Sequence, residues 1–312
     1  MQLNIIFISG TDKDSIWKRC LEDELPGAHV YVYPDCPLAK KDIDYAVVWN
    51  PPAGELATYP GLKAILSLGA GIDGIVSDPG LPKDVPIIRL VDRCLTQGMT
   101  EYVLYWVLHF HRRMGEYAEM MAARRWDDFF QADTAKTKVG VLGLGELGSD
   151  AAKALSALNF QVAGWSRSAK SIDGVTCLHD AAGFAEVLSG SSILICLLPL
   201  TPQTEGILNA AAFAELPRGA VVVNCARGGH LIDADLLSAL DSGQLSAAVL
   251  DVFHSEPLPQ EHPFWAHPKI HMTPHMASLT TPQSAVLFLA ENIRRIERGV
   301  PALSRIDLGR GY

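Results

Sequence analysis

The sequence predicts an α/β protein built from two domains, each a parallel sheet flanked by helices, and three observations support this prediction. The 312 residues exceed what one hydrophobic core usually organises. Short apolar runs alternate with helix-compatible segments in both halves of the chain. A glycine-rich loop directly follows one of these runs and opens a helical stretch. We therefore expect two domains that each bury a core.

The first third of the chain carries five apolar runs separated by turn signals. Helix-compatible segments lie between these runs, which is typical of a parallel sheet with helical connections. The predicted strands cover residues 4–8, 29–33, 45–49, 64–68 and 87–90.

A single long helix is predicted for residues 100–126. This segment lacks proline, and Val103, Trp106, Val107 and Phe110 follow the i, i+3, i+4, i+7 spacing of one helical face. The other positions are also largely apolar, so we expect the helix to be buried on most sides, between domains or between subunits.

A second α/β series follows, with six predicted strands at residues 138–142, 161–165, 192–197, 220–224, 247–252 and 270–273. Helices fill most of the intervals, including residues 146–158. Asp233 is predicted to cap a helix that ends near residue 241, with Gly243 just beyond it. Thr281 and Pro282 are predicted to start a final helix that stops near Gly299.

The composition indicates a soluble globular protein. The chain is 48% hydrophobic and 20% charged, and it contains no apolar run of the roughly 20 residues that a membrane-spanning helix needs. Its formal charge of −9 opposes nucleic-acid binding. No secretory signal is evident, so we expect a cytoplasmic protein without a membrane or nucleic-acid partner. The six cysteines form no CxxC pair, and we expect Cys196 and Cys225 to be buried thiols.

The glycine-rich loop is the candidate dinucleotide site of a Rossmann-like domain. Gly143, Gly145 and Gly148 form a GxGxxG pattern with Glu146 and Leu147 between the last two glycines. The first glycine permits a tight turn, the second lets the backbone approach a pyrophosphate, and the third allows close packing of helix on strand. The helix N-terminus favours the anion.

The residues after the next predicted strand indicate which dinucleotide is bound. An acidic residue about 20 positions after the loop would bind the ribose hydroxyl of NAD. Here the chain has Ser166, Arg167 and Ser168, which supply donors to a 2′-phosphate. NADP(H) is therefore the preferred cofactor and NAD(H) a possible one, although Arg167 could also be an ordinary solvated loop residue.

Three further side chains follow predicted strands and suit the reduction of a 2-oxo acid. Hydride transfer to such an acid needs a cation for the carboxylate, a proton donor for the carbonyl oxygen, and a group that keeps that donor protonated. Arg227, Glu256 and His275 supply these chemical types at the ligand-binding edge of an open α/β sheet. Taken singly, each could be an ordinary exposed or structural residue.

At this point the sequence resembles the D-isomer-specific 2-hydroxyacid dehydrogenases over nearly the whole chain. Arg227 and Glu256 are 29 residues apart and Glu256 and His275 are 19 apart, which is also similar to the family. The resemblance is closest to the glyoxylate/hydroxypyruvate reductase A subgroup. The segments that carry it are 143–148, 198–204, 224–228, 250–253, 256–257 and 273–275, and for the subgroup 45–52, 68–73 and 310–312.

The resemblance implies a role for each site residue. Arg227 would bind the substrate carboxylate and polarise the carbonyl, His275 would donate the proton, and Glu256 would hydrogen-bond His275 and favour its imidazolium form. The backbone at Ala70 and Gly71 would also bind the carboxylate, and Trp49 would form a wall of a small pocket. The remaining cofactor contacts would come from Leu198, Pro199, Thr204, Cys225, Ala226, Arg227, Asp251 and His275, with Asp251 beside the nicotinamide carboxamide.

The family also implies how the domains divide. We expect a substrate-binding domain from residues 1–99 and 282–312, an NAD(P)-binding domain from residues 100–281, and the active-site cleft between them. The long helix and the loop at residues 125–130 would contact a second subunit, so we expect a homodimer.

Several alternatives stay open. The chain could be another family dehydrogenase acting on a different 2-oxo acid, on formate or on phosphite, although formate dehydrogenases carry Gln where this chain has Glu256. It could be an NAD(H)-sensing scaffold similar to the corepressors that share the fold. A Rossmann-like methyltransferase would not need the Arg, Glu and His set. We expect no metal, because His262, His267, His271 and His275 are irregularly spaced and separated by prolines.

Overall fold

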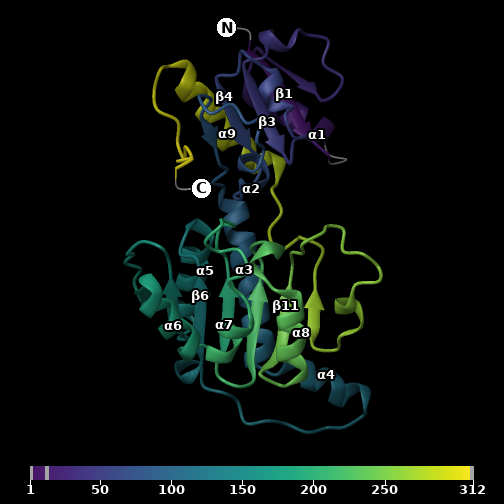
Figure 1. Cartoon of the computed structure of the whole chain (residues 1–312), viewed down its shortest axis with the longest axis vertical. Coiled ribbons are helices and arrows are strands. Elements are labelled where there is room, and N and C mark those ends of the chain that lie inside the picture. The colour runs from purple at the N-terminus through teal and green to yellow at the C-terminus, as the bar shows by residue number, and fades with distance from the viewer. Residues whose placement is uncertain (1–2, 11–13, 310–312) are drawn as a thin grey trace. The chain divides into compact units, whose positions relative to one another are not determined.

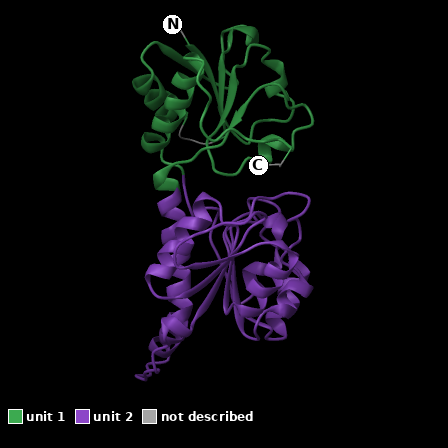
Figure 2. Ribbon diagram, turned by 90° about the vertical axis from the view of Figure 1, so that its left-hand side faces the viewer, with its two compact units in different colours: residues 1–95, 280–312 green, residues 96–279 purple. Residues whose placement is uncertain are grey.

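The computed structural model describes residues 3–10 and 14–309, so the 310–312 motif lies outside the described residues. The chain divides into two compact units (Figure 2). Unit 1 combines Met1–Leu95 with Thr280–Tyr312, and unit 2 is Thr96–Leu279. Helix α3 (Arg93–His111) runs through the first of these boundaries.

Unit 1 contains a five-stranded sheet in the order β2-β1-β3-β4-β5, and every pairing is parallel. The fold class is therefore confirmed for this unit. Its elements are β1 (Leu3–Ser9), α1 (Asp14–Glu24), β2 (Ala28–Val32), β3 (Tyr45–Trp49), β4 (Ala64–Ser67), α2 (Asp73–Val76), β5 (Ile87–Ile88) and α9 (Pro282–Glu297), with single 3-10 turns at Lys40–Asp42 and Leu56–Thr58.

Strand β1 shows why the strands of unit 1 read as continuous apolar runs. Ile5 and Phe7 belong to one core cluster, and Ile6 and Ile8 belong to another on the opposite face. A strand buried on both faces requires apolar side chains at every position rather than at alternate ones. The final helix α9, shown in yellow in Figure 1, supplies Leu289 to the same cluster as Phe7.

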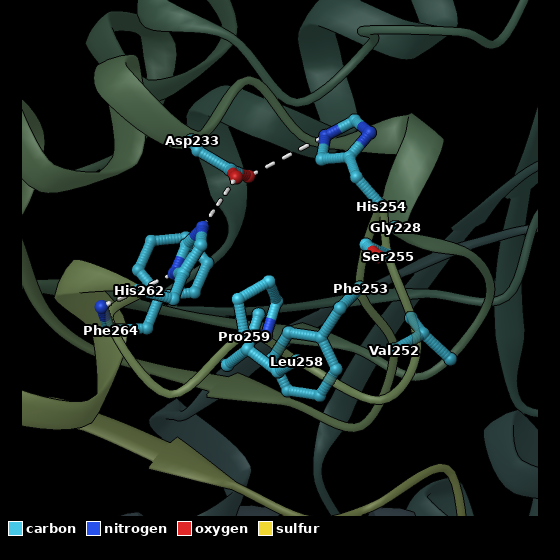
Figure 3. A pocket seen from close by; sticks show the side chains of 10 residues that line it. All are labelled: Gly228, Asp233, Val252, Phe253, His254, Ser255, Leu258, Pro259, His262 and Phe264. Carbon is cyan, nitrogen blue, oxygen red and sulfur yellow. Dashed lines mark hydrogen bonds and ion pairs between the residues drawn. The ribbon is translucent and has the colours of Figure 1, made fainter.

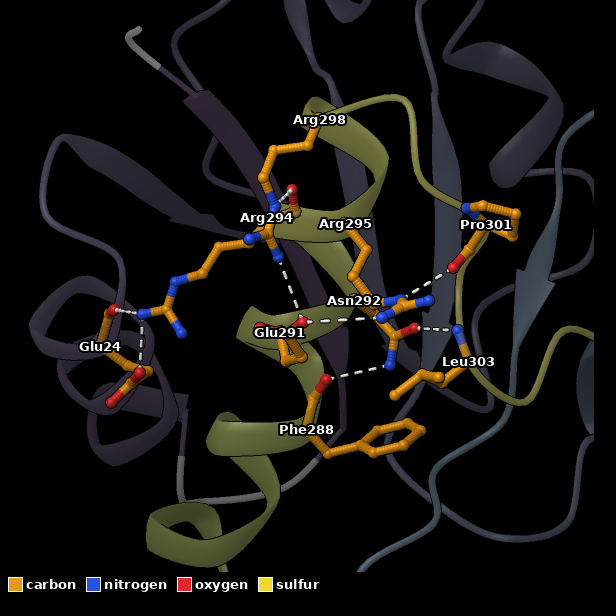
Figure 4. Close-up of polar contacts among 9 residues, drawn as sticks. All are labelled: Glu24, Phe288, Glu291, Asn292, Arg294, Arg295, Arg298, Pro301 and Leu303. Carbon is orange, nitrogen blue, oxygen red and sulfur yellow. Dashed lines mark hydrogen bonds and ion pairs between the residues drawn. The ribbon is translucent and has the colours of Figure 1, made fainter.

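Helix α9 also anchors the segment that follows it (Figure 4). The buried Asn292 donates a hydrogen bond from its amide to Phe288 O at 3.0 Å, and its oxygen accepts one from Leu303 N at 2.7 Å. Arg295 donates to Pro301 O at 2.8 Å. The chain after the helix is thereby fixed against unit 1.

Unit 2 contains a seven-stranded parallel sheet in the order β12-β11-β10-β9-β6-β7-β8. The chain starts in the middle at β6, proceeds to β8 on one side, and then returns to β9 and proceeds to β12 on the other. The order reverses between β6 and β9, and ligands of such sheets bind at this reversal. The elements are α3, α4 (Met114–Ala122), β6 (Lys138–Leu142), α5 (Glu146–Ala157), β7 (Gln161–Trp165), β8 (Val175–Leu178), α6 (Asp180–Gly190), β9 (Ile193–Cys196), α7 (Ala210–Glu215), β10 (Ala220–Asn224), α8 (Asp233–Asp241), β11 (Leu245–Leu250) and β12 (Ile270–Met272), with 3-10 turns at Thr134–Lys136, Gly228–His230 and Pro263–Ala266.

The prediction of one helix over residues 100–126 is wrong. Helix α3 begins earlier, where the Asp92 carboxylate accepts a hydrogen bond from Leu95 N at 2.9 Å, and it ends at His111. Arg113 then adopts the left-handed conformation (φ 55°), in which an α-helix cannot continue. Its guanidinium pairs with Glu116 of α4 and stacks on the Phe129 ring at 3.5 Å, which stabilises the break. In the single chain Val103 and Val107 of α3 are buried, whereas Tyr105 is 59% exposed, so the expectation of burial between subunits stays a prediction.

Two smaller predictions also need correction. Strand β8 was missed, because this edge strand is only partly buried and its run of apolar residues is short. Asp233 does not cap α8: Ile232 is at the cap position, and Asp233 lies in the first turn. Its carboxylate contacts His254 and His262 instead.

Three other expectations concern membranes, thiols and metals. No helix in the part of the chain that the structure describes is long and apolar enough to cross a membrane. Cys196 and Cys225 are buried, as predicted, and burial raises the pKa of Cys196 to about 12. Within residues 3–10 and 14–309, no group of three or more His, Cys, Asp or Glu side chains could hold a metal ion.

Candidate functional site

The three predicted reaction residues follow three neighbouring parallel strands. Arg227 comes after β10, Glu256 after β11 and His275 after β12, and these strands are adjacent in the sheet. The carboxyl ends of parallel strands meet at one edge. The charge of Arg227 also acts on the Glu256 carboxylate, so the structure brings the three residues into one cluster.

Glu256 and His275 form a direct pair. Glu256 Oε2 lies 2.7 Å from His275 Nδ1, and Glu256 Oε1 accepts a hydrogen bond from Phe253 N at 2.9 Å. Burial raises the pKa of Glu256, but the hydrogen bonds from His275 and Phe253 and the charges of His275 and Arg227 outweigh it, so the net pKa is below the ordinary value. The carboxylate is therefore ionised and only accepts, and Nδ1 must be the donor. Nε2 is the second ring nitrogen, and it takes no part in the contact with Glu256.

The backbone that carries His275 is held by Asp251. His275 itself has φ 49°, a conformation that is unfavourable for a residue with a side chain. Asp251 is 1% exposed, and its carboxylate accepts hydrogen bonds from Thr273 Oγ1 at 2.5 Å and from Met276 N and Ala277 N at 2.9 Å each. Its backbone oxygen accepts from His275 N at 2.8 Å. Asp251, expected beside a nicotinamide, thus has its carboxylate engaged within this turn.

The segment that carries Glu256 is held differently (Figure 3). Asp233 lies between two histidines of this segment, with its oxygens 3.5 Å from His254 Nε2 and 3.4 Å from His262 Nε2. His254 Nε2 also lies 2.9 Å from Leu231 O. The two histidines and Asp233 line a small pocket together with Gly228, Val252, Phe253, Ser255, Leu258, Pro259 and Phe264.

Arg227 is fixed by the end of β10. The side-chain amide of Asn224 donates to Arg227 O at 2.9 Å, and its oxygen accepts from Ala226 N at 3.2 Å. A Cβ added to Gly228 would lie 2.0 Å from the carbonyl carbon of Phe253. Glycine is therefore required here, because the segment that carries Arg227 and the segment that carries Glu256 touch through their backbones.

The glycine-rich loop connects β6 to α5 beside the reversal of strand order. Gly143 has φ 102°, and an added Cβ would lie 2.6 Å from Leu197 O. A Cβ on Gly148 would lie 1.8 Å from Gly143 O, so only glycine lets the helix approach the loop this closely. A Cβ on Gly145 would meet no heavy atom within 4 Å. The backbone at the helix N-terminus, where Glu146 and Leu147 begin α5, is thus open to a ligand.

The residues expected around the remainder of a dinucleotide lie on the strands next to this loop. Ser166, Arg167 and Ser168 follow β7, where Ser166 Oγ donates to Ser168 O at 2.8 Å and the side chains of Arg167 and Ser168 are exposed. Leu198 and Pro199 follow β9, and Thr204 Oγ1 fixes their turn by donating to Pro199 O at 2.7 Å. The buried Cys225 and Ala226 follow β10.

Trp49, Ala70 and Gly71 belong to unit 1. Trp49 ends β3, and Ala70 and Gly71 follow β4, its neighbour in the sheet. A Cβ on Gly69 would lie 2.3 Å from the Trp49 ring, so the indole packs directly on this backbone. Trp49 and the Ala70–Gly71 backbone are therefore close neighbours, as a shared role requires.

Two residues that the sequence interpretation left without a role also belong to this region. Thr273 is part of the 273–275 motif, and Tyr102 lies within the segment 100–126 predicted to be a long helix, but neither has a role of its own there. In the structure Tyr102 OH and Thr273 Oγ1 are 2.7 Å apart. No sequence signal joins two residues so far apart in the chain.

Comparisons of the sequence and of the structure with known proteins point to the same family. The NAD-binding domain of the D-isomer specific 2-hydroxyacid dehydrogenases matches residues 104–277. Glyoxylate/hydroxypyruvate reductase A of Serratia proteamaculans is 44% identical over 99% of this chain and 100% of its own. A D-isomer specific 2-hydroxyacid dehydrogenase from Xanthobacter autotrophicus, solved with NADPH and MES, is 41% identical with a TM-score of 0.95. An NADPH-dependent glyoxylate/hydroxypyruvate reductase from Sinorhizobium meliloti, solved with NADP and sulfate, is 39% identical with a TM-score of 0.93, and both structures cover 100% of each chain.

Proposed function

The chain belongs to the D-isomer specific 2-hydroxyacid dehydrogenase family, and from this premise we propose that it is an NADPH-dependent reductase of small 2-oxo acids. Its substrates are glyoxylate and hydroxypyruvate, and its products are glycolate and D-glycerate. The observation that carries the proposal is the Glu256–His275 pair at 2.7 Å beside Arg227 on adjacent strand ends. The relatives named above carry the activity in their names.

In this proposal Arg227 and His275 supply the protein's own contributions to the reduction, which are substrate binding and proton donation. Arg227 binds the substrate carboxylate and draws electron density toward the carbonyl oxygen. His275 donates a proton from Nε2 to that oxygen, while Glu256 accepts from Nδ1 and orients the imidazole ring. When bound, the reduced nicotinamide supplies the hydride that C2 of the substrate accepts.

The residues present fit NADPH. The open backbone at Gly145 and the N-terminus of α5 suit a pyrophosphate, because helix amides point at the anion. Ser166, Arg167 and Ser168 offer donors to the 2′-phosphate, and Arg167 adds a positive charge. NAD(H) lacks this phosphate and binds less tightly. We propose that unit 2 binds the cofactor, and that Trp49 and the backbone of Ala70 and Gly71 contact the substrate.

We also infer that the chain forms a homodimer through α4 and the segment after it. Trp126 and Phe130 are fully exposed in the single chain, and Met114 and Met121 of α4 are at least half exposed. Large apolar side chains grouped on a surface favour burial against a partner. Light scattering on the purified protein distinguishes a dimer from a monomer.

The testing experiment follows the oxidation of NADPH, and separately NADH, with glyoxylate, hydroxypyruvate, pyruvate and phenylpyruvate. Fast oxidation of NADPH with the first two acids is expected. Replacing Arg227 by Ala should lower kcat/KM on the order of 10²–10³-fold and leave NADPH binding nearly intact. Arg218→Ala is the matched control, because Arg218 is exposed, donates a hydrogen bond to Ser242 O, and precedes β10 whereas Arg227 follows it.

Each outcome of this experiment has a clear meaning. A better rate with NADH would refute the assignment of Ser166, Arg167 and Ser168 and leave the reduction itself intact. Reduction of no acid with either cofactor would refute the proposed activity and favour a dinucleotide-sensing protein. Loss of NADPH binding in Arg227→Ala would contradict the role given to Arg227.

A further inference from the structure

We propose that Tyr102 on α3 is a positioning residue for His275, acting through the Thr273 hydroxyl and the buried Asp251 carboxylate. The proposal rests on the function proposed above, because it assigns Tyr102 a part in presenting the proton donor of that reaction. It adds a residue from a helix whose expected role was only packing.

The backbone conformation of His275 is the reason that a positioning residue is needed. Its φ of 49° places it in the left-handed region, where the Cβ crowds the backbone. A residue stays in this region only when its surroundings fix it there. The direction of the imidazole ring follows from this backbone, so whatever fixes the turn also fixes the position of Nε2.

The surroundings that fix the turn converge on Asp251. Its carboxylate accepts hydrogen bonds from Met276 N and Ala277 N, the two amides that follow His275, and from Thr273 Oγ1 two residues before it. Hydrogen bonds to a buried charge are stronger than those between neutral groups. The turn is therefore held on both sides of His275 by one carboxylate.

The direction of each hydrogen bond follows from the available protons. Thr273 has one hydroxyl proton, and it points at Asp251 Oδ1, since an ionised carboxylate can only accept. Thr273 Oγ1 must then accept from Tyr102 OH at 2.7 Å. The chain of donors runs from Tyr102 through Thr273 to Asp251, and each bond polarises the next.

Tyr102 is well suited to be the first donor. Burial raises its pKa, and the charge of Asp251 adds to this effect, so the hydroxyl keeps its proton. Its ring packs edge-on against Trp106 one turn later on α3, with ring centroids 6.3 Å apart. The hydroxyl is thus presented from a rigid element to the turn of His275.

The experiment compares Tyr102→Phe with Tyr105→Phe, a matched change on the same helix at a residue that is 59% exposed. Tyr102→Phe should lower kcat about 3- to 10-fold, as expected for one hydrogen bond, with the KM for NADPH unchanged. Tyr105→Phe should behave like the parent. Thr273→Val should lower kcat at least as much as Tyr102→Phe, whereas Thr273→Ser, which keeps the hydroxyl, should restore it.

Amide hydrogen exchange provides a readout that does not depend on turnover. The amides of Met276 and Ala277 should exchange faster in Tyr102→Phe and Thr273→Val than in the parent, and at the parental rate in Tyr105→Phe and Thr273→Ser. An unchanged kcat with unchanged exchange in Tyr102→Phe would overturn the proposal. Equal losses in kcat, NADPH affinity and melting temperature would overturn it too, because they indicate a purely structural role.

The experiment also remains decisive if Tyr102→Phe does not fold or if the parent protein is inactive. If Tyr102→Phe does not fold, the pair Thr273→Val and Thr273→Ser tests the same hydroxyl without altering the helix. If the parent reduces no 2-oxo acid, the proposed function fails, while exchange at Met276 and Ala277 still shows whether Tyr102 holds the turn.

Discussion

The two segments that bring Glu256 and His275 together are supported in opposite ways. The turn of His275 rests on Asp251, a carboxylate that is 1% exposed and accepts three hydrogen bonds of 2.5–2.9 Å. The segment of Glu256 is tied to Asp233, whose side chain is 31% exposed and lies 3.4 and 3.5 Å from its two histidines.

This difference matches what each residue must do. A proton donor has to meet one substrate atom at hydrogen-bond distance, so its position must be set by short bonds to a buried group. An orienting carboxylate follows its histidine through a direct 2.7 Å contact, and a looser support is sufficient. Solvent-exposed ion pairs contribute little stability, whereas hydrogen bonds to a buried charge contribute more.

The largest expected effect comes from replacing Asp251 by Asn. The amide keeps one oxygen, but its NH₂ group must face one of the backbone amides that now donate to the carboxylate. The free energy of unfolding should fall by about 3 kcal/mol, and kcat should fall with it. Urea unfolding measures the first quantity. A loss of less than about 1 kcal/mol would mean that Asp251 supports the turn of His275 no more strongly than Asp233 supports the segment of Glu256.

Glu256→Gln has an intermediate effect with a distinctive pH dependence. The rate should drop about 10- to 100-fold near neutral pH, because the neutral amide replaces the charged acceptor that orients the His275 ring through Nδ1. Since the pKa of Glu256 is lowered in the folded state, its carboxylate adds stability that is present above the unfolded value near 4.5 and is lost as the pH falls through the folded value.

The measurement for Glu256 is the melting temperature of both proteins from pH 7 to pH 3. The gap between the parent and Glu256→Gln should be constant above about pH 5 and narrow below about pH 4.5. A gap that widens toward acid would mean that the carboxylate is not held in its charged form.

Asp233→Asn should have the smallest effect. Its contacts with the two histidines are long and partly exposed, so the free energy of unfolding should change by no more than about 1 kcal/mol and the rate by less than about 3-fold. Asp235→Asn is the matched control, since Asp235 lies in the same helical turn and accepts instead from Ala210 N. A loss as large as that of Asp251→Asn would show that the segment of Glu256 needs a rigid support after all.

The sequence predicted what depends on local pattern. Strands such as β3 and β6 match their predicted bounds, because a buried parallel strand is a continuous apolar run. The cluster of Arg227, Glu256 and His275 was predictable because each residue follows such a run, and the carboxyl ends of parallel strands share an edge.

Features that depend on tertiary contact could not be predicted. The helical pattern of residues 100–126 continues through Arg113, and it does not indicate the left-handed break, at which the Arg113 guanidinium stacks on the distant Phe129 ring. Tyr102 and Thr273 are 171 residues apart, and nothing local indicates that their hydroxyls meet. The local sequence predicts that Asp233 caps a helix, but its carboxylate contacts His254 and His262 on the segment after β11.

The division of unit 1 into two stretches of chain has a consequence for the order of events on the ribosome. Its core joins Phe7 and Leu21 to Leu289 and Ile293 of α9, which is translated after the whole of unit 2. The first 95 residues therefore emerge without the helix that completes their core, whereas unit 2 is contiguous and can fold as soon as it has emerged. The nascent chain must keep an unfinished apolar sheet from aggregating until its last helix is made.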